Sequence, residues 1–119
     1  MERMKLLVKD LVLDCEVAVR KEEQKQGLSG REDLDLNKGM MFLFDKTGRF
    51  SIWMRDMHFS LDIMCLNMEY KVCEMACLDK AFQGLYTPNY PVKAIIEMPS
   101  GSLKRHAIRI GDQVEFGIY

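Results

Sequence analysis

Side chains that could bind a ligand gather in and just before the segment 39–62. An indole ring offers a flat apolar surface, and a guanidinium group can hold a carboxylate or a phosphate through two parallel hydrogen bonds. The candidate ligand-binding residues chosen on this basis are Arg31, Trp53, Arg55, Asp56 and Asp62. Their types predict a site for a small polar ligand or a peptide beside Trp53 and Arg55.

The same charges also allow a purely structural interpretation. A charge next to Trp53 and Met54 is unfavourable to bury unless an opposite charge pairs with it. A pair between an arginine and an aspartate would meet this requirement, and it would hold the 55–60 loop against the rest of the fold. The residue pattern leaves the binding and the structural interpretations open.

Two further kinds of chemistry are less well supported by the residues. Asp56, His58 and Asp62 are spaced as Asp-x-His-x3-Asp, which matches no established metal site, so we expect no metal and no cofactor. The chain contains no Gly-x-Ser-x-Gly nucleophile motif and no glycine-rich phosphate loop. An enzyme is therefore the least favoured class of protein.

Short strands must position these residues, because apolar and polar residues alternate over most of the chain. The alternation is clearest in 11–19, 92–98 and 114–118, while 40–44 is a continuous apolar run typical of a strand that is buried on both faces. Further strands are expected over 5–9, 50–54, 61–68 and 71–78, and the segment 79–91 is expected to be a long loop. Short helices are expected over 21–26, ending at Gly27, and over 101–107, with Ser100 as the N-cap.

These elements predict a mostly β (α+β) domain. About eight short strands and two short helices favour a compact β-barrel or a sandwich. The segment Ile108–Val114 resembles the endings of double-psi β-barrels, so a double-psi-like topology is one form that the barrel could take.

Length and charge limit the function classes. The 119 residues fit one domain, and the formal net charge of −1 argues against general binding of nucleic acid. No apolar run reaches the 18 residues of a membrane span, and residues 1–14 lack the pattern of a signal peptide. We therefore expect a cytoplasmic protein with four reduced cysteines, which we expect to serve as core thiols.

Several spaced motifs resemble the bacterial and archaeal family called domain of unknown function 192. The matching positions are Gly27, Leu28 and Arg31; Gly39 to Phe44; Trp53 to Arg55; Leu61 to Ile63; Ile96 to Gly101; and Ile108, Gly111, Asp112 and Val114. The resemblance covers about residues 17–116. This sequence departs from the family at Asp56, where Asn is usual, at Ser60, where Pro is usual, and at Ala107, where Gly is usual. The family has no established activity, so the resemblance implies a fold and no function.

Two main hypotheses of function follow from the sequence. The first is a non-enzymatic binding module whose ligand, a small polar molecule or a peptide, lies near Trp53 and Arg55. The alternative is a structural or interaction protein, such as an accessory subunit of a larger assembly or a phage-encoded protein. The partner is thus a small molecule or a protein, and no pattern in the chain indicates an oligomeric state.

Overall fold

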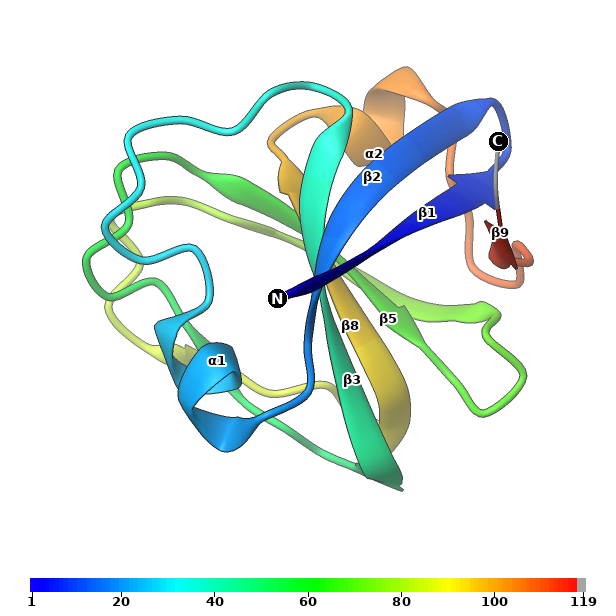
Figure 1. Cartoon of the computed structure of the whole chain (residues 1–119), viewed down its shortest axis with the longest axis horizontal. Helices are drawn as coiled ribbons and strands as arrows, with labels where there is room; N and C mark the ends of the chain where they lie inside the picture. Colours follow the sequence, from blue (N-terminus) through cyan, green and yellow to red (C-terminus); the bar gives the residue numbers. More distant parts are fainter. Residues whose placement is uncertain (118–119) are drawn as a thin grey trace.

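The computed structural model describes residues 1–117 and contains nine strands and two short helices over that range (Figure 1). The elements are β1 (Glu2–Val8), β2 (Leu11–Ala18), α1 (Lys21–Gln26), β3 (Lys38–Gly48), β4 (Ile52–Trp53), β5 (Leu61–Leu66), β6 (Val72–Leu78), β7 (Leu85–Tyr86), β8 (Val92–Pro99), α2 (Ser102–Arg105) and β9 (Glu115–Gly117). Neither of the two described helices is long and apolar enough to cross a membrane.

Seven of the strands form one sheet in the order β6-β5-β8-β3-β2-β1-β9, and β4 pairs with β7 in a separate two-stranded ribbon. The pair β2–β3 is parallel, while the other neighbours in the sheet are antiparallel. A parallel pair needs a crossover connection, and residues 19–37, which include α1, supply it here.

The two ends of the sheet approach each other without joining into a barrel. The backbone N–H of Val72 donates to the carbonyl of Asp112, that of Val114 donates to Tyr70, and Lys71 forms an isolated bridge with Gln113. Over residues 1–117, however, no strand ladder links β6 to β9. The predicted mostly β fold is confirmed in its sandwich-like form, and a double-psi topology, which requires a closed barrel, does not describe this open strand order.

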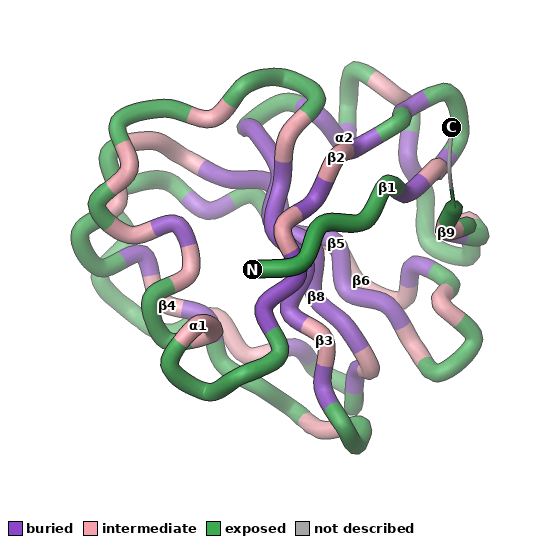
Figure 2. The backbone as a smooth tube through the Cα atoms, in the orientation of Figure 1, coloured by how far each residue is buried: buried purple, intermediate pink, exposed green. Residues whose placement is uncertain are grey.

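Two apolar cores lie on opposite faces of the sheet. In β3, Met41 packs into the first core, whereas Met40 and Phe42 pack into the second. In β8, Ile96 and Ile95 divide in the same way. Residues 39–44 of β3 and 92–99 of β8 lie in the middle of the sheet, and all of them except Leu43 and Lys93 are buried (Figure 2). This explains the continuous apolar run in β3.

The second core is covered by the crossover and by the small ribbon. The helix α1 and the segments around β4 and β7 lie together on one side (left in Figure 1), while α2 and β9 lie on the other. The amide of Gln24 fixes α1 in this place, because its Nε2 donates to the carbonyls of Ala18 and Leu43, both at 3.1 Å.

Most expected elements are present, and their differences have local causes. The helix α1 has the predicted bounds, whereas β7 is a two-residue strand within the predicted 79–91 loop. The assignment of Ser100 as an N-cap was wrong, since α2 begins one residue later with Gly101 as its cap. The predicted end of the last strand, Ile118, lies outside the described residues.

The four cysteines are free thiols with different degrees of burial. Cys15 and Cys65 are buried as expected, whereas Cys73 is partly buried and Cys77 is exposed. Burial raises the pKa of the Cys15 and Cys65 thiols to about 12, so both stay neutral at ordinary pH.

Candidate ligand pocket

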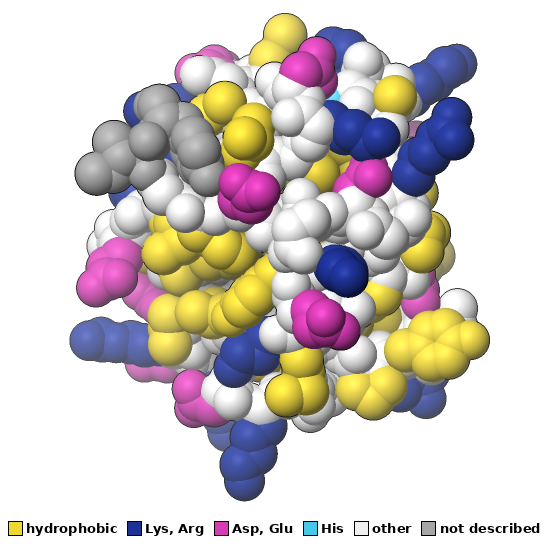
Figure 3. All heavy atoms as spheres, turned by 90° about the vertical axis from the view of Figure 1, so that its right-hand side faces the viewer, with side chains coloured by type: hydrophobic (Ala, Val, Ile, Leu, Met, Phe, Trp, Pro, Cys, Tyr) yellow, Lys and Arg dark blue, Asp and Glu magenta, His cyan; other side chains and the backbone are white. Residues whose placement is uncertain are grey.

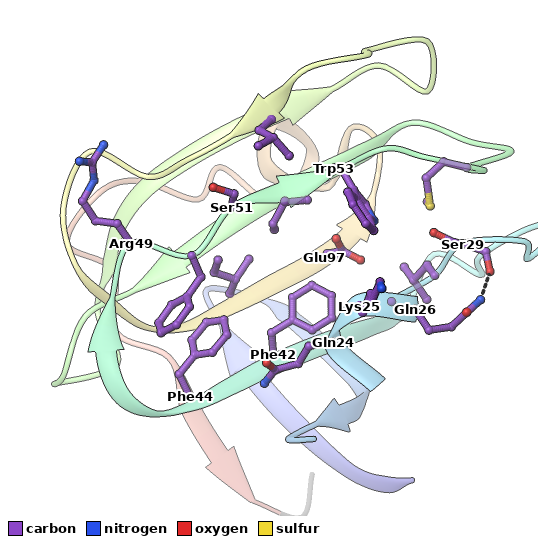
Figure 4. Close-up of a pocket in the computed structure, with 17 residues that line it drawn as sticks. Gln24, Lys25, Gln26, Ser29, Phe42, Phe44, Arg49, Ser51, Trp53 and Glu97 are labelled. Atoms are coloured by element: carbon purple, nitrogen blue, oxygen red, sulfur yellow. Dashed lines mark hydrogen bonds between the residues drawn. The ribbon is translucent and has the colours of Figure 1, made fainter. Parts of the chain in front are cut away.

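A cavity of about 470 Å³ lies on the second-core face, beneath the C-terminal end of α1 (Figure 4). Four aromatic side chains line it, from β3, from β4 and from the turn between them: Phe42, Phe44, Phe50 and Trp53. The rings of Phe44 and Phe50 stack with their centres 3.8 Å apart, which gives part of the wall a fixed shape. Most of the remaining wall comes from residues 24–29 and from Ile95, Met57 and Leu85.

The carboxyl group of Glu97 lies among these aromatic side chains. Glu97 is in the central strand β8, two residues after Ile95, so its side chain is on the second-core face. Only 3% of the residue is exposed, and its Oε1 atom has no hydrogen-bond partner. Burial raises the pKa of this carboxyl to about 8. A buried polar atom without a partner is uncommon in a protein interior and calls for an explanation.

A glycine keeps the space beside this carboxyl open. Gly27 ends α1 with a φ of +50°, a conformation that residues with a side chain rarely adopt. A Cβ atom at Gly27 would lie 3.4 Å from Cζ of Phe42 and 3.8 Å from Oε1 of Glu97. The glycine therefore ends the helix and also leaves room for a group of methyl size against Glu97.

Trp53 separates this cavity from a second hollow. The second hollow, of about 510 Å³, is lined by residues 53–56 and 80–85, so Trp53 and Leu85 border both spaces. The guanidinium carbon of Arg55 lies 4.7 Å from the centre of the Trp53 ring, in a cation–π contact. Two of the predicted site residues, Trp53 and Arg55, are thus in contact with each other, and both border the second hollow.

The loop that carries Asp56 is held through its backbone. The hydroxyl of Ser29 donates to the Arg55 carbonyl at 2.8 Å, and the N–H of Gly30 donates to the Asp56 carbonyl at 2.9 Å. Asp56 has a φ of +59°, a left-handed conformation that Asn and Asp adopt more readily than most residues. This conformation gives a physical reason why proteins of the domain of unknown function 192 family, which this sequence resembles, usually have Asn at this position.

The other two predicted site residues lie elsewhere. Arg31 forms an ion pair with Glu16 beside a third, smaller hollow. Asp62 is 1% exposed and accepts hydrogen bonds from the backbone N–H groups of Gly101 and Leu103, at the start of α2 on the first-core face. Of the five predicted residues, only Trp53, Arg55 and Asp56 lie together.

The segment 56–62 does not bring metal-ligating groups together. Asp56 and His58 are exposed, whereas Asp62 is buried against α2. Within residues 1–117, no three His, Cys, Asp or Glu side chains form a group that could hold a metal ion.

Glu97, Gly27 and the phenylalanines of the cavity were not among the candidate residues predicted from the sequence. One signal was available, because a single glutamate stands in the run Ala94-Ile95-Ile96-Glu97-Met98. A strand with apolar residues on both faces belongs at the centre of a sheet, where a glutamate cannot reach solvent. The alternation of the strand alone does not reveal this.

The surface carries charges of both signs. On the face shown in Figure 3, Lys and Arg side chains are intermixed with Asp and Glu side chains, and neither sign dominates. The totals of the two signs are nearly equal, with 17 Lys and Arg against 18 Asp and Glu.

Comparison with known proteins places this chain in a family. The profile of the DUF192 family, described as an uncharacterized ACR, matches residues 4–116, and the chain belongs to this family. No curated protein gives a significant match.

Two crystal structures have a similar fold. A protein from Sinorhizobium meliloti 1021, described provisionally as a transcription regulator, is 24% identical with a TM-score of 0.88, and the match covers 96% of this chain and 92% of that one. A protein of unknown function from Novosphingobium aromaticivorans DSM 12444 is 26% identical with a TM-score of 0.85, covering 95% of this chain and 84% of that one. Neither comparison supplies an activity.

Proposed function

We propose that this protein is a non-enzymatic binding module that holds a small ligand in the cavity beside Trp53. The observation that carries the proposal is the unpartnered carboxyl of Glu97 at the aromatic cavity. Ligand sites in proteins are typically apolar hollows with a few polar groups that orient the ligand, and this cavity has that composition.

The ligand that fits has an apolar body and one polar group. The apolar body would pack against Phe42, Ile95 and the Phe44–Phe50 stack, and the polar group would reach Glu97. The hydroxyls of Ser29 and Ser51 line the cavity, but they are hydrogen bonded to the Arg55 carbonyl and to the Thr87 hydroxyl. This leaves Glu97 as the group best placed to orient a ligand.

Trp53 provides a direct assay, because it is the only tryptophan in the chain. Small molecules with one apolar and one polar end are screened for a change in Trp53 emission together with a rise in melting temperature. A ligand that binds the folded protein alone must raise its apparent stability. If no compound changes either signal, the binding proposal is wrong.

A matched pair of leucines tests whether the ligand enters this cavity. Leu85 lines the cavity and is 62% exposed, whereas Leu36 is 63% exposed and does not line it. Leu85→Ala is expected to weaken ligand binding several-fold, because apolar contact area is lost. Leu36→Ala is expected to leave the affinity unchanged.

Binding of a protein partner is the second candidate function, and one specific observation supports it. The segment around the ribbon exposes three large apolar side chains, those of Phe82, Leu85 and Tyr90. Phe82 and Leu85 also border the second hollow together, and grouped exposed apolar side chains are a common feature of protein interfaces. Replacing Phe82 and Tyr90 by Ser is expected to abolish any self-association or partner binding that sedimentation detects, while leaving small-molecule binding intact.

A further inference from the structure

We propose that the ligand of this cavity carries a primary ammonium group, for which Glu97 serves as the counter-ion. The inference rests on the proposed function and specifies the chemical class of the ligand. It follows from two observations: the Glu97 carboxyl has no cationic partner among the described residues, and aromatic side chains surround it.

No described residue supplies a cation to Glu97. Apart from Glu97, the charged residues that line the cavity are Lys25 and Arg49. Lys25 is exposed on α1, and Nε of Arg49 donates to the Pro88 carbonyl at 2.8 Å. None of the ion pairs within residues 1–117 includes Glu97. Without a partner, a buried carboxyl avoids the cost of its charge by keeping a proton. For Glu97 to carry its charge, a cation must come from outside the described residues.

The surroundings of the carboxyl favour an organic cation. Figure 4 shows Glu97 between the Trp53 and Phe42 side chains. The faces of aromatic rings attract cations, and the attraction is stronger where water is excluded. An ammonium group also brings N–H donors, one of which would satisfy the orphan Oε1 atom. The space that Gly27 leaves open beside Oε1 has about the size of this group.

Other ligand classes fit the carboxyl less well. An anionic group would repel the ionised form of Glu97 in a site of low dielectric constant. A neutral alcohol could exchange a hydrogen bond with the protonated carboxyl, but it brings no charge to stabilise the carboxylate, so it gains less from Glu97 than an ammonium group does. Lys25 and Arg49 stand where solvent and salt screen their charges, so their repulsion of an incoming amine is small.

Binding of an ammonium group is coupled to the release of a proton. With a pKa of about 8 that burial alone causes, most Glu97 carboxyls carry a proton at pH 7. The walls contributed by β3 and β4 bear no titratable group, and those from α1 and the 49–51 turn bear only Lys25 and Arg49. An ammonium ion stabilises the carboxylate, so each bound amine displaces nearly one proton at pH 7. The affinity therefore rises as the pH increases through about 8, until the amine itself loses its charge near about pH 10.

Calorimetry with three matched probes tests the inference. Phenethylamine, phenethyl alcohol and phenylpropanoate are titrated into the wild-type protein at pH 7 in two buffers of different ionisation enthalpy. The amine is expected to bind at least about tenfold more tightly than the other two. It is also expected to release nearly one proton, which the difference in heat between the buffers measures.

The outcomes separate this inference from the proposed function. If the alcohol or the carboxylate binds as tightly as the amine, the ammonium assignment is wrong but the cavity remains a ligand site. If the amine binds without proton release, Glu97 is not its counter-ion. If none of the three binds, the ammonium assignment is also wrong, while the proposed function is judged by the broader screen.

A variant gives an independent result. Glu97→Gln keeps the shape of the side chain but removes its charge, so amine binding is expected to fall at least about tenfold. Glu22→Gln, on the exposed side of α1, is the matched control and is expected to bind the amine as the wild type does. If Glu97→Gln does not fold, the proton release of the wild-type protein still decides the question.

Discussion

The Oδ2 atom of Asp62 accepts a hydrogen bond of 2.9 Å from the backbone N–H of Leu103, which lies forty-one residues later in the chain. The N–H of Gly101 donates to the same oxygen at 3.1 Å. A carboxylate from β5 thus satisfies two N–H groups at the start of α2, a role that a helix normally assigns to its own N-cap residue.

Removing this carboxylate is expected to destabilise the fold. Asp62→Ala leaves two N–H groups beside a buried site without an acceptor, so the free energy of unfolding should fall by about 2–3 kcal/mol. Asp62→Asn keeps one oxygen and should lose less. Urea unfolding measures both, with Asp45→Ala at an exposed position as the control. An equal loss for Asp62→Ala and Asp45→Ala would contradict this role.

The stability of the ligand-free protein should fall as the pH rises from about 5 to 8. The pKa of Glu97 is raised from 4.5 to about 8 on folding, so between these values the folded state holds a proton that the unfolded state has lost. The free energy of unfolding then decreases with pH, by a few kcal/mol in all. Below about pH 4.5 both states are protonated, and above about pH 8 the loss is complete.

Urea unfolding at several pH values, comparing the wild type with Glu97→Gln, checks this slope. The variant has no group to titrate at this position and should have a flatter profile. The control Glu22→Gln should keep the wild-type slope. A wild-type profile without a decrease over this range would mean that the Glu97 carboxyl is not isolated in the folded state.

Ala107→Gly is expected to stabilise the protein. Ala107 follows α2 with a φ of +53°, and the hydrogen bonds Ile108 N–H to Leu103 carbonyl and Ala107 N–H to Lys104 carbonyl form a Schellman motif. The residue at this position of the motif has a positive φ, which favours glycine. This agrees with the Gly that is usual at this position in the DUF192 family. The gain should be about 1 kcal/mol, since a Cβ atom is strained in this conformation.

Thermal unfolding measures this gain directly. Ala81→Gly, at an exposed position without a positive φ, is the matched control and should be neutral or slightly destabilising. If Ala107→Gly destabilised the protein as well, strain at this residue would not limit its stability.

Arg55→Ala is expected to alter Trp53 more than it alters stability. The cation–π contact of an exposed arginine contributes about 0.5–1 kcal/mol at most, and the loop keeps its backbone hydrogen bonds to Ser29 and Gly30. The emission of Trp53 should shift, because the substitution removes the positive charge of the guanidinium group that lies against its ring. Arg109→Ala should leave the spectrum unchanged, and a large loss of stability in Arg55→Ala would restore the view of Arg55 as a structural anchor.

The fold could be predicted further from the sequence than the site could. Local patterns are enough to place α1 and most strands, because alternation and glycine positions are properties of neighbouring residues. Trp53 could be predicted as a cavity residue because tryptophan occurs only once in the sequence and has a large flat side chain. Its contact with Arg55 joins residues only two positions apart. The order of strands is a non-local property, and no local pattern encodes it.

This non-local property explains the errors at the site. Asp62 and Trp53 are nine positions apart, but Asp62 lies on the first-core face and Trp53 borders the cavity on the second. From the sequence alone, Glu97 is interpreted as a solvent-facing polar residue of an alternating strand. Only the strand order shows that β8 lies between β5 and β3, inside the sheet. Once that order is known, the burial of its carboxyl follows.

The crossover 19–37 joins the one parallel pair of the sheet and also supplies a wall of the cavity, from Gln24 to Ser29. The register of β2 and β3 is set by their own ladder and does not depend on the length of this connection. Insertions or substitutions in the crossover can therefore reshape the cavity while the sheet stays intact. Within one family, the shape of the cavity can therefore differ through this segment, and the same segment is the place to begin when redesigning the cavity.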